Sequence, residues 1–362
     1  MHIRNIAVAL TLTAVCQSLP ADDNTALARF DHPARTRIWQ ASFQQGFGLF
    51  SMADDAAIER FLALSAKRCN QFYSYCPRDH RDSYRYKNFI QTRITPGSYN
   101  IPGVDRVIMI NLDRRPEKLK ESLAALSPYS IVPDRLSAVD GKLLGPEVVS
   151  QMGVQFHPDM LCFMATRYFD ASAGKQAGKC VHEIIHPCKQ TWLVHCTSRM
   201  QFGCYLSHLS AIWDAYWSGA QRLWMLEDDI QVVTDPHQIC TYIDKLESIV
   251  GNEGWDALFT DMDHKTSKGE VVSCSGYTMR PDLFVENDVF HRKDISEDFI
   301  QYGSRYGTHS YIISRAGMEK IIAFSDVFGM FAPIDFDMCV VPGIRLFAMK
   351  NPMIETTSMV HD

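Results

Sequence analysis

The spacing of apolar residues changes near residue 104. Before it, the stretch from Ala56 to Leu64 (AAIERFLAL) repeats apolar side chains at helical spacing. From Val104 onward, short apolar runs alternate with stretches of helical periodicity, which is the pattern of an α/β domain. We therefore expect a helical N-terminal region over residues 22–103, followed by an α/β domain with a mostly parallel central sheet over residues 104–362.

Individual runs predict the elements of that domain. Short apolar runs of the kind that form buried strands occur at residues 107–110, 223–226, 255–260 and 307–314. Helices are predicted to begin near Pro116, Gly203, Asp235 and Arg315. The helix after Gly203 carries one apolar stripe that we expect to face the core: Leu209, Ile212, Trp213 and Tyr216.

The composition fits a globular protein and excludes several classes. Hydrophobic residues make up 46% of the 362 positions and charged residues 22%, which rules out a disordered tail protein, a collagen-like chain and a coiled-coil rod. The net charge is −6, so no broad positive field exists to attract a phosphate backbone. We expect no nucleic-acid partner.

The first residues have the pattern of a signal peptide. Arg4 precedes an apolar run over residues 6–15, and small residues follow near Ala21. Ten apolar residues span about 15 Å as a helix, half of a bilayer core, so we expect no stable transmembrane span. Residues 1–21 therefore predict export through the secretory pathway, with a buried N-terminal strand or helix as the alternative.

The cysteines fit export. The chain has 11, and an even number remains once Cys16 is removed with the leader. Disulfides in an oxidising compartment explain an even count, with Cys69–Cys76 and pairs within residues 180–204 as the expected bridges. Buried free thiols are the alternative, and no CxxC pair supports a zinc ribbon or a thioredoxin-type site. The cysteine-rich stretch at about 160–200 is expected to be an excursion from the α/β domain.

An acidic triplet follows the predicted strand at 223–226. Glu227, Asp228 and Asp229 would lie at the carboxyl end of a buried strand, where ligands bind in parallel α/β sheets. Carboxylate oxygens there suit Mn²⁺ or Mg²⁺. A solvated acidic turn is the alternative. A second acidic edge, Asp261 and Asp263 with His264, is a rival metal site.

Two further groups of polar residues are candidates for ligand contacts. Arg114 and Arg115 follow a predicted strand and precede a helix that begins at Pro116, a natural seat for a diphosphate. Two solvated surface arginines are the alternative. Ser207 and His208 lie in the first turns of the helix after Gly203 and can either face a cleft or serve as satisfied structural groups.

Taken in order, these motifs resemble glycosyltransferase family 25, the lipooligosaccharide β-galactosyltransferases and collagen galactosyltransferases. The matching segments are VIMINLDRRPEK (107–118), GCYLSHLSAIW (203–213), LWMLEDDI (223–230), GTHSYIISRAGMEKI (307–321) and PID (333–335). The resemblance covers about residues 104–362 and leaves 22–100 unexplained. It implies a GT-A-type fold that uses a divalent metal to hold a nucleotide sugar. One departure is Lys118, where the family usually has arginine, which weakens the case for a bidentate contact there.

The resemblance also implies roles for individual residues. Asn111 and Arg114, with Arg115 beside them, would lie against the nucleotide or its phosphates, and Ser207 and His208 would line the cleft. Glu227 and Asp228 would contact the donor, with Asp229 and Asp228 as metal ligands. Asp335, in a proline turn on the acceptor side, would be the catalytic base of an inverting transfer, with Asp261 or Asp263 as rivals.

The expected activity is therefore metal-dependent transfer of a sugar, galactose above all, from a nucleotide sugar such as UDP-galactose. The acceptor would be a glycan or a glycoprotein, as in lipooligosaccharide biosynthesis. A non-catalytic nucleotide-sugar or carbohydrate-binding protein of the same fold is one alternative, because nucleotide sugars are scarce outside the cytosol and secretory organelles. A metallo-hydrolase that uses the second acidic edge with the triplet is another.

Overall fold

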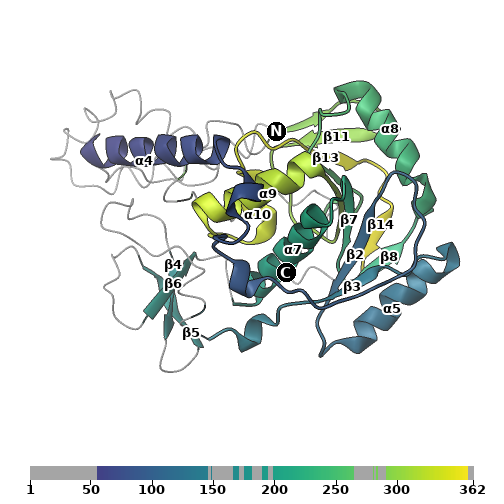
Figure 1. Ribbon diagram of the computed structural model, residues 1–362, viewed down its shortest axis with the longest axis horizontal. Coiled ribbons are helices and arrows are strands. Elements are labelled where there is room, and N and C mark those ends of the chain that lie inside the picture. The colour runs from purple at the N-terminus through teal and green to yellow at the C-terminus, as the bar shows by residue number, and fades with distance from the viewer. Residues whose placement is uncertain are drawn as a thin grey trace, which may run out of the picture.

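The computed structural model describes residues 55–145, 166–170, 175–181, 190–194, 199–264 and 291–357, together with residues 148, 280 and 283. A nine-stranded sheet forms its centre, with helices on both faces (Figure 1). The expected α/β class is confirmed. The predicted signal peptide at 1–21 lies outside the described residues, and none of the helices described is both long and apolar enough to cross a membrane.

The central sheet is mixed. Its order is β1-β3-β2-β7-β12-β9-β13-β11-β10. Only the pairs β3–β2, β2–β7 and β9–β13 are parallel; the rest are antiparallel. The bounds are β1 Ile94–Thr95, β2 Arg106–Asn111, β3 Asp134–Ser137, β7 Arg222–Leu226, β9 Ala257–Phe259, β10 Arg292–Asp294, β11 Phe299–Tyr302, β12 Ser310–Ser314 and β13 Leu346–Met349. The four runs predicted to be strands thus form β2, β7, β9 and β12, but β12 runs against both neighbours.

Helices pack on the two faces of this sheet because its central strands are apolar on both sides. In β7, Leu223 and Met225 belong to one core cluster, and Trp224 and Leu226 to the other. Helices α7 (Arg199–Trp217) and α9 (Arg315–Phe328) cover the first face, and α5 (Pro116–Leu126) and α8 (Ile239–Val250) cover the second. The predicted stripe of α7 does face the core.

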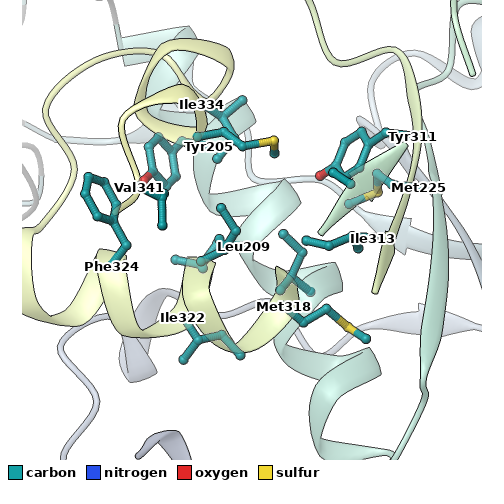
Figure 2. Packing of buried hydrophobic residues seen from close by; sticks show 14 of the residues in the cluster. Tyr205, Leu209, Met225, Tyr311, Ile313, Met318, Ile322, Phe324, Ile334 and Val341 are labelled. Carbon is teal, nitrogen blue, oxygen red and sulfur yellow. The ribbon is translucent and has the colours of Figure 1, made fainter. Parts of the chain in front are cut away.

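Figure 2 shows the core beneath α7 and α9. Tyr205 and Leu209 of α7 pack with Met225, Tyr311 and Ile313 of the sheet and with Met318, Ile322 and Phe324 of α9. Deeply buried aromatic and aliphatic side chains of this size contribute about 1.5–3 kcal/mol each. This core fixes the helix and the two strands that carry the polar residues described below.

Local signals explain where the helices begin. Pro116 is the first residue of α5, and the Ser314 side chain accepts a hydrogen bond from the backbone N–H of Gly317 at the start of α9. Asp235 and Pro236 open a short 3₁₀ turn (Pro236–Gln238) that leads into α8. Residues Ile334–Cys339 form a short helix, α10, so Asp335 lies in a helical first turn rather than in an open proline turn.

The N-terminal part is built into the same structure. Helix α4 (Asp55–Tyr73) extends the predicted helical stretch, and Arg68 donates a 2.6 Å hydrogen bond to the carbonyl of Val327 in α9. Tyr84 is buried and its hydroxyl lies 2.6 Å from Ser325 Oγ. Strand β1 pairs with β3 of the central sheet. The described residues up to 145 also include short 3₁₀ helices, at Pro77–His80, Lys87–Phe89, Ser127–Tyr129 and Gly141–Leu143.

Smaller sheets and the cysteines complete the description. Strands β8 (Ile230–Val232) and β14 (Ile354–Thr356) pair antiparallel. In the cysteine-rich stretch, β4 (Thr166–Asp170), β5 (Lys175–Val181) and β6 (Gln190–Val194) form a three-stranded sheet. The structure shows no disulfide between Cys69 and Cys76, and this bridge stays a prediction. Cys69 lies on α4 with its side chain packed toward the core, whereas Cys76 lies beyond the helix end.

Candidate functional site

Two parallel strands end side by side and present polar residues at the same edge of the sheet. Asn111 is the last residue of β2, and Asp228 follows the end of β7. Asn111 Nδ2 donates a 2.6 Å hydrogen bond to Asp228 Oδ2. Because carboxyl ends of parallel strands form the usual ligand edge of an α/β sheet, this contact marks the candidate site.

Arg135 fixes the orientation of Asn111. Its guanidinium donates two hydrogen bonds, at 3.0 and 2.8 Å, to Asn111 Oδ1. Only the amide nitrogen of Asn111 can then face Asp228. Arg135 Nη2 also lies 2.6 Å from Oδ1 of Asp113, whose carboxylate in turn accepts from Ser137 and Arg93. The predicted donor residue Asn111 is thus a buried link between β2, β3 and β7.

Glu227 lies between α7 and β12. His208 Nε2 of α7 is 3.2 Å from Glu227 Oε1, and the Thr308 hydroxyl donates to the same oxygen at 3.1 Å. The other ring nitrogen of His208 is 3.0 Å from the Tyr311 hydroxyl. His208 is fully buried, so both of its nitrogens are satisfied and the ring is held toward Glu227.

Asp229 meets a histidine from the neighbouring antiparallel strand. His309 precedes β12, and its Nδ1 lies 3.2 Å from Asp229 Oδ1 and 3.7 Å from Glu227 Oε2. One ligand atom from each of Glu227, Asp229 and His309 lies within 4.8 Å of the others. Two carboxylate oxygens and an imidazole nitrogen suit Mn²⁺ better than Mg²⁺, which prefers oxygen alone.

The side chain of Asp228 turns to Asn111 instead of joining this set. Residues 227–229 form the bend between β7 and β8, which directs the Glu227 and Asp229 side chains to His309 and the Asp228 side chain to Asn111. Of the two predicted metal ligands, the structure therefore brings Asp229 to Glu227 and His309, and leaves Asp228 on the Asn111 amide.

The electrostatics agree with a cluster of acids that meets positive charge. Burial alone would raise the pKa of Glu227, but His309 and His208 outweigh it and hold that pKa below its usual range. Burial opposes charge on His309 as well, yet Glu227 and Asp229 raise its pKa to about 9. Burial, followed by the neighbouring His309, lowers the pKa of His264. Neutral His264, 3.1 Å from His309, can then accept its Nε2 proton.

Asp335, in the first turn of α10, lies within electrostatic reach of Glu227. Its carboxylate accepts backbone hydrogen bonds from Gly307 at 3.0 Å and from Phe336 at 3.1 Å. Burial raises the pKa of Asp335, and the charge of Glu227 adds to the rise. Gly307 has φ +84, and a Cβ there would lie 2.5 Å from His264 Nε2. Glycine is therefore required for the close packing of this loop.

The second acidic edge is neutralised by arginines. Asp261 is buried and paired with buried Arg305. Asp263 accepts from Arg292 at 2.5 Å and from the Tyr302 hydroxyl at 2.7 and 2.8 Å. Strand β12 separates β9 from β7, so Asp261 and Asp263 follow a different strand from the acidic triplet, and it is His264 that reaches the first group, through His309 at 3.1 Å. These carboxylates have guanidinium partners where a metal-binding hydrolase site would need free oxygens.

Three predicted residues have other surroundings. Arg114 forms a 2.6 Å ion pair with Asp140 and is partly exposed. Burial raises the pKa of Asp228, and the hydrogen bond from Asn111 and the charge of Arg115 oppose that rise without cancelling it. Ser207 Oγ accepts from the backbone of Val139 at 2.9 Å and donates to the carbonyl of Gly203. The serine hydroxyl therefore holds the loop before residue 141 against α7.

Sequence reasoning missed His309 and Arg135. His309 stands in the quoted segment GTHSYIIS, and its signal was a histidine at the start of a buried strand. Only the antiparallel pairing of β12 with β7 places that start beside the acidic triplet. Arg135 carries no comparable signal, because a lone arginine in a short strand is common.

Comparisons with known proteins match the segment of the chain that carries these residues. The family model for glycosyltransferase family 25 (LPS biosynthesis protein) matches residues 105–339. "Inactive glycosyltransferase 25 family member 3" of Mus musculus is 23% identical over 240 residues, 65% of this chain and 32% of the relative. "Procollagen galactosyltransferase 2" of Mus musculus is 23% identical over 236 residues, 64% of this chain and 29% of the relative. The match thus spans about a third of the length of these relatives.

Proposed function

Because the chain belongs to glycosyltransferase family 25, we propose that it transfers a sugar from a nucleoside diphosphate sugar to an acceptor hydroxyl with the help of a divalent metal. The observation that carries this proposal is the convergence of Glu227, Asp229 and His309 at the carboxyl edge of the sheet. We propose galactose as the sugar, since one relative is named a procollagen galactosyltransferase, and a glycan or protein as the acceptor.

The residues at this edge fit a bound Mn²⁺. Glu227, Asp229 and His309 would hold it through two oxygens and one nitrogen. When bound, the ion would neutralise the charge that develops on the leaving diphosphate. Arg115, half-exposed beside Asp228, would add a second positive group near the phosphates. Asn111 and Arg135 keep Asp228 in place as a further donor contact.

Asp335 is proposed to take the proton of the acceptor hydroxyl. An inverting transfer needs one carboxylate as base, and a base whose pKa is raised by burial is stronger than an exposed one. Two backbone N–H groups hold the Asp335 carboxylate in one orientation. Asp261 and Asp263 are weaker candidates because each carboxylate already forms an ion pair with an arginine.

A second candidate function is binding of the nucleotide sugar without turnover. Several relatives are named inactive or probably inactive members of the family, which favours this alternative. The arginine partners of Asp261 and Asp263 argue against the third class, a metal-dependent hydrolase built on those residues.

A screen of nucleotide sugars for Mn²⁺-dependent hydrolysis tests the proposal, with UDP-galactose first. Wild-type protein should release the nucleoside diphosphate from one donor, and chelation should stop the release. The Asp229→Asn protein serves as the matched control. A donor that binds in calorimetry without any release would support the binding protein and reject the enzyme.

A further inference from the structure

Helix α7 carries two potential metal ligands on one face. Cys204 and His208 are four residues apart, and a spacing of one turn places both side chains on the same side of a helix. That side faces Glu227: His208 Nε2 lies 3.2 Å from Glu227 Oε1. The Cys204 sulfur, the imidazole nitrogen and a carboxylate oxygen all lie within 4.8 Å of one another. Three ligand atoms this close can hold one ion.

We propose that Cys204, His208 and Glu227 form a second cation site, which takes a thiophilic divalent ion such as Zn²⁺. A thiolate sulfur, an imidazole nitrogen and a carboxylate oxygen are the ligand types that zinc takes in proteins. The neighbouring set with Asp229 and His309 offers no sulfur, so the two sites differ in the metal they select. Three protein ligands leave the fourth tetrahedral position open to water.

The surroundings of His208 support this assignment. Its Nδ1 is 3.0 Å from the Tyr311 hydroxyl, and both side chains are fully buried. In metal sites, the ring nitrogen that does not bind the ion makes a hydrogen bond of this kind, which fixes the orientation of the ring. The nitrogen that faces Glu227 is therefore already directed at the proposed ion.

The local charge also favours a cation. Cys204 is partly buried and within electrostatic reach of four carboxylates: Glu227, Asp335, Asp229 and Asp228. On binding, the thiol proton of Cys204 would leave to solvent and the sulfur would bond to the ion. The thiolate and Glu227 would then balance the two positive charges, and a neutral centre costs less to bury than an isolated ion.

Glu227 belongs to both ligand sets, so the two ions should compete for it. This consequence rests on the proposed function, because it assumes that Mn²⁺ at Glu227, Asp229 and His309 supports turnover. Zinc bound through Cys204 would draw Glu227 away and inhibit Mn²⁺-dependent hydrolysis. Thermodynamic linkage requires that Mn²⁺ weaken zinc binding by the same factor.

Titration of the full-length, reduced protein with Co²⁺ tests the site directly. Cobalt substitutes for zinc and gives a sulfur-to-cobalt charge-transfer absorption when a thiolate binds it. We expect this absorption in the wild type, and its loss in both Cys204→Ser and His208→Gln. The matched control is Cys240→Ser, a partly exposed thiol on α8, which should keep it. An unchanged spectrum in either folded variant of the site, or no absorption in the wild type, would overturn the proposal.

Zinc inhibition provides the second measurement. In Cys204→Ser, the zinc concentration for half-inhibition of Mn²⁺-dependent hydrolysis should rise at least about tenfold, because losing even an outer hydrogen-bond partner of a ligand costs about 10–100-fold. Equal inhibition of both proteins would place the inhibitory zinc elsewhere. If the wild type hydrolyses no donor, the proposed function fails, while the cobalt spectrum still decides the metal site.

Discussion

Asn111 and Asp228 are 117 positions apart in the sequence, yet Asn111 Nδ2 donates a 2.6 Å hydrogen bond to Asp228 Oδ2. Arg135 occupies the amide oxygen of Asn111 with two hydrogen bonds. The amide therefore cannot rotate to present its oxygen to Asp228 without losing both contacts. A side chain that looked like a nucleotide contact in the sequence is the element that orients the middle acid of the triplet.

Replacement of Asn111 by aspartate should lower turnover. The variant keeps an oxygen for Arg135 but places a second carboxylate oxygen against Asp228, so an attractive hydrogen bond becomes a repulsion. Hydrogen bonds to charged groups contribute about 1.5–3 kcal/mol, so kcat/KM for donor hydrolysis should fall at least about tenfold. Lys245→Ala, on α8 and paired with Asp298, is the surface control. Wild-type kinetics in Asn111→Asp would show that Asp228 needs no orientation.

Asp229→Asn should abolish most of the activity while leaving the fold intact. The change relieves the repulsion between Asp229 and Glu227 but also breaks the ion pair between Asp229 and His309, so the two effects oppose each other and thermal stability should change little. Loss of a main electrostatic stabiliser costs about 10²–10³ in rate, and Mn²⁺ affinity should fall with it. Asp228→Asn should cost less, because that side chain contacts Asn111. A folded Asp229→Asn protein with near-full, metal-dependent transfer would refute the site.

Asp335→Asn should separate transfer from donor binding. A missing general base costs about 10²–10⁴ in rate, while calorimetric affinity for the donor should remain close to wild type. Gly307 and Phe336 donate to different oxygens of Asp335, so asparagine keeps one of these two hydrogen bonds and loses the other, and the melting temperature should fall modestly. A proportional loss of donor affinity and transfer would instead mean that Asp335 shapes the donor pocket.

Asp263→Asn should affect acid stability more than activity. Despite burial, Arg292 and the neighbouring charge of Arg305 hold the pKa of Asp263 below its usual value. A lowered folded-state pKa means that this carboxylate contributes stability above pH about 4, and the contribution is lost as the pH falls through the lowered pKa. The free energy of unfolding of the variant should be about 2 kcal/mol lower at pH 7. Measured by denaturant titration, it should also decrease less steeply than that of the wild type as the pH falls below about 4.

The activity of the same variant tests the rival base. Measured where the protein is fully folded, donor hydrolysis and transfer by Asp263→Asn should stay within a few-fold of wild type. A loss of activity as large as that expected for Asp335→Asn would identify Asp263 as the base. It would also support the alternative hypothesis of a hydrolase that uses the second acidic edge.

Much of the fold follows from local pattern. The apolar runs of β2 and β7, the proline at the start of α5 and the serine cap of α9 could be predicted because neighbours in sequence determine them. The antiparallel insertion of β12 between β7 and β9 could not, because it depends on pairing over long distances. That insertion brings His309 to Asp229 and separates Asp261 from Glu227. Likewise, the ion pair between Arg305 and Asp261 can be recognised only in the folded structure.

The residues of the candidate site differ in how much the stability of the core depends on them. His208 and Tyr311 are completely buried, whereas the side chains of Asp229 and His309 keep 11% and 13% of their surface exposed. A lineage that no longer needed catalysis would still be selected for a stable core. Drift should therefore erase Asp229 and His309 early and spare His208 and Tyr311 for much longer. We therefore expect the histidine of α7 to persist in relatives that have lost activity, and the Asp229–His309 pair to persist only where the proposed metal-dependent transfer is kept.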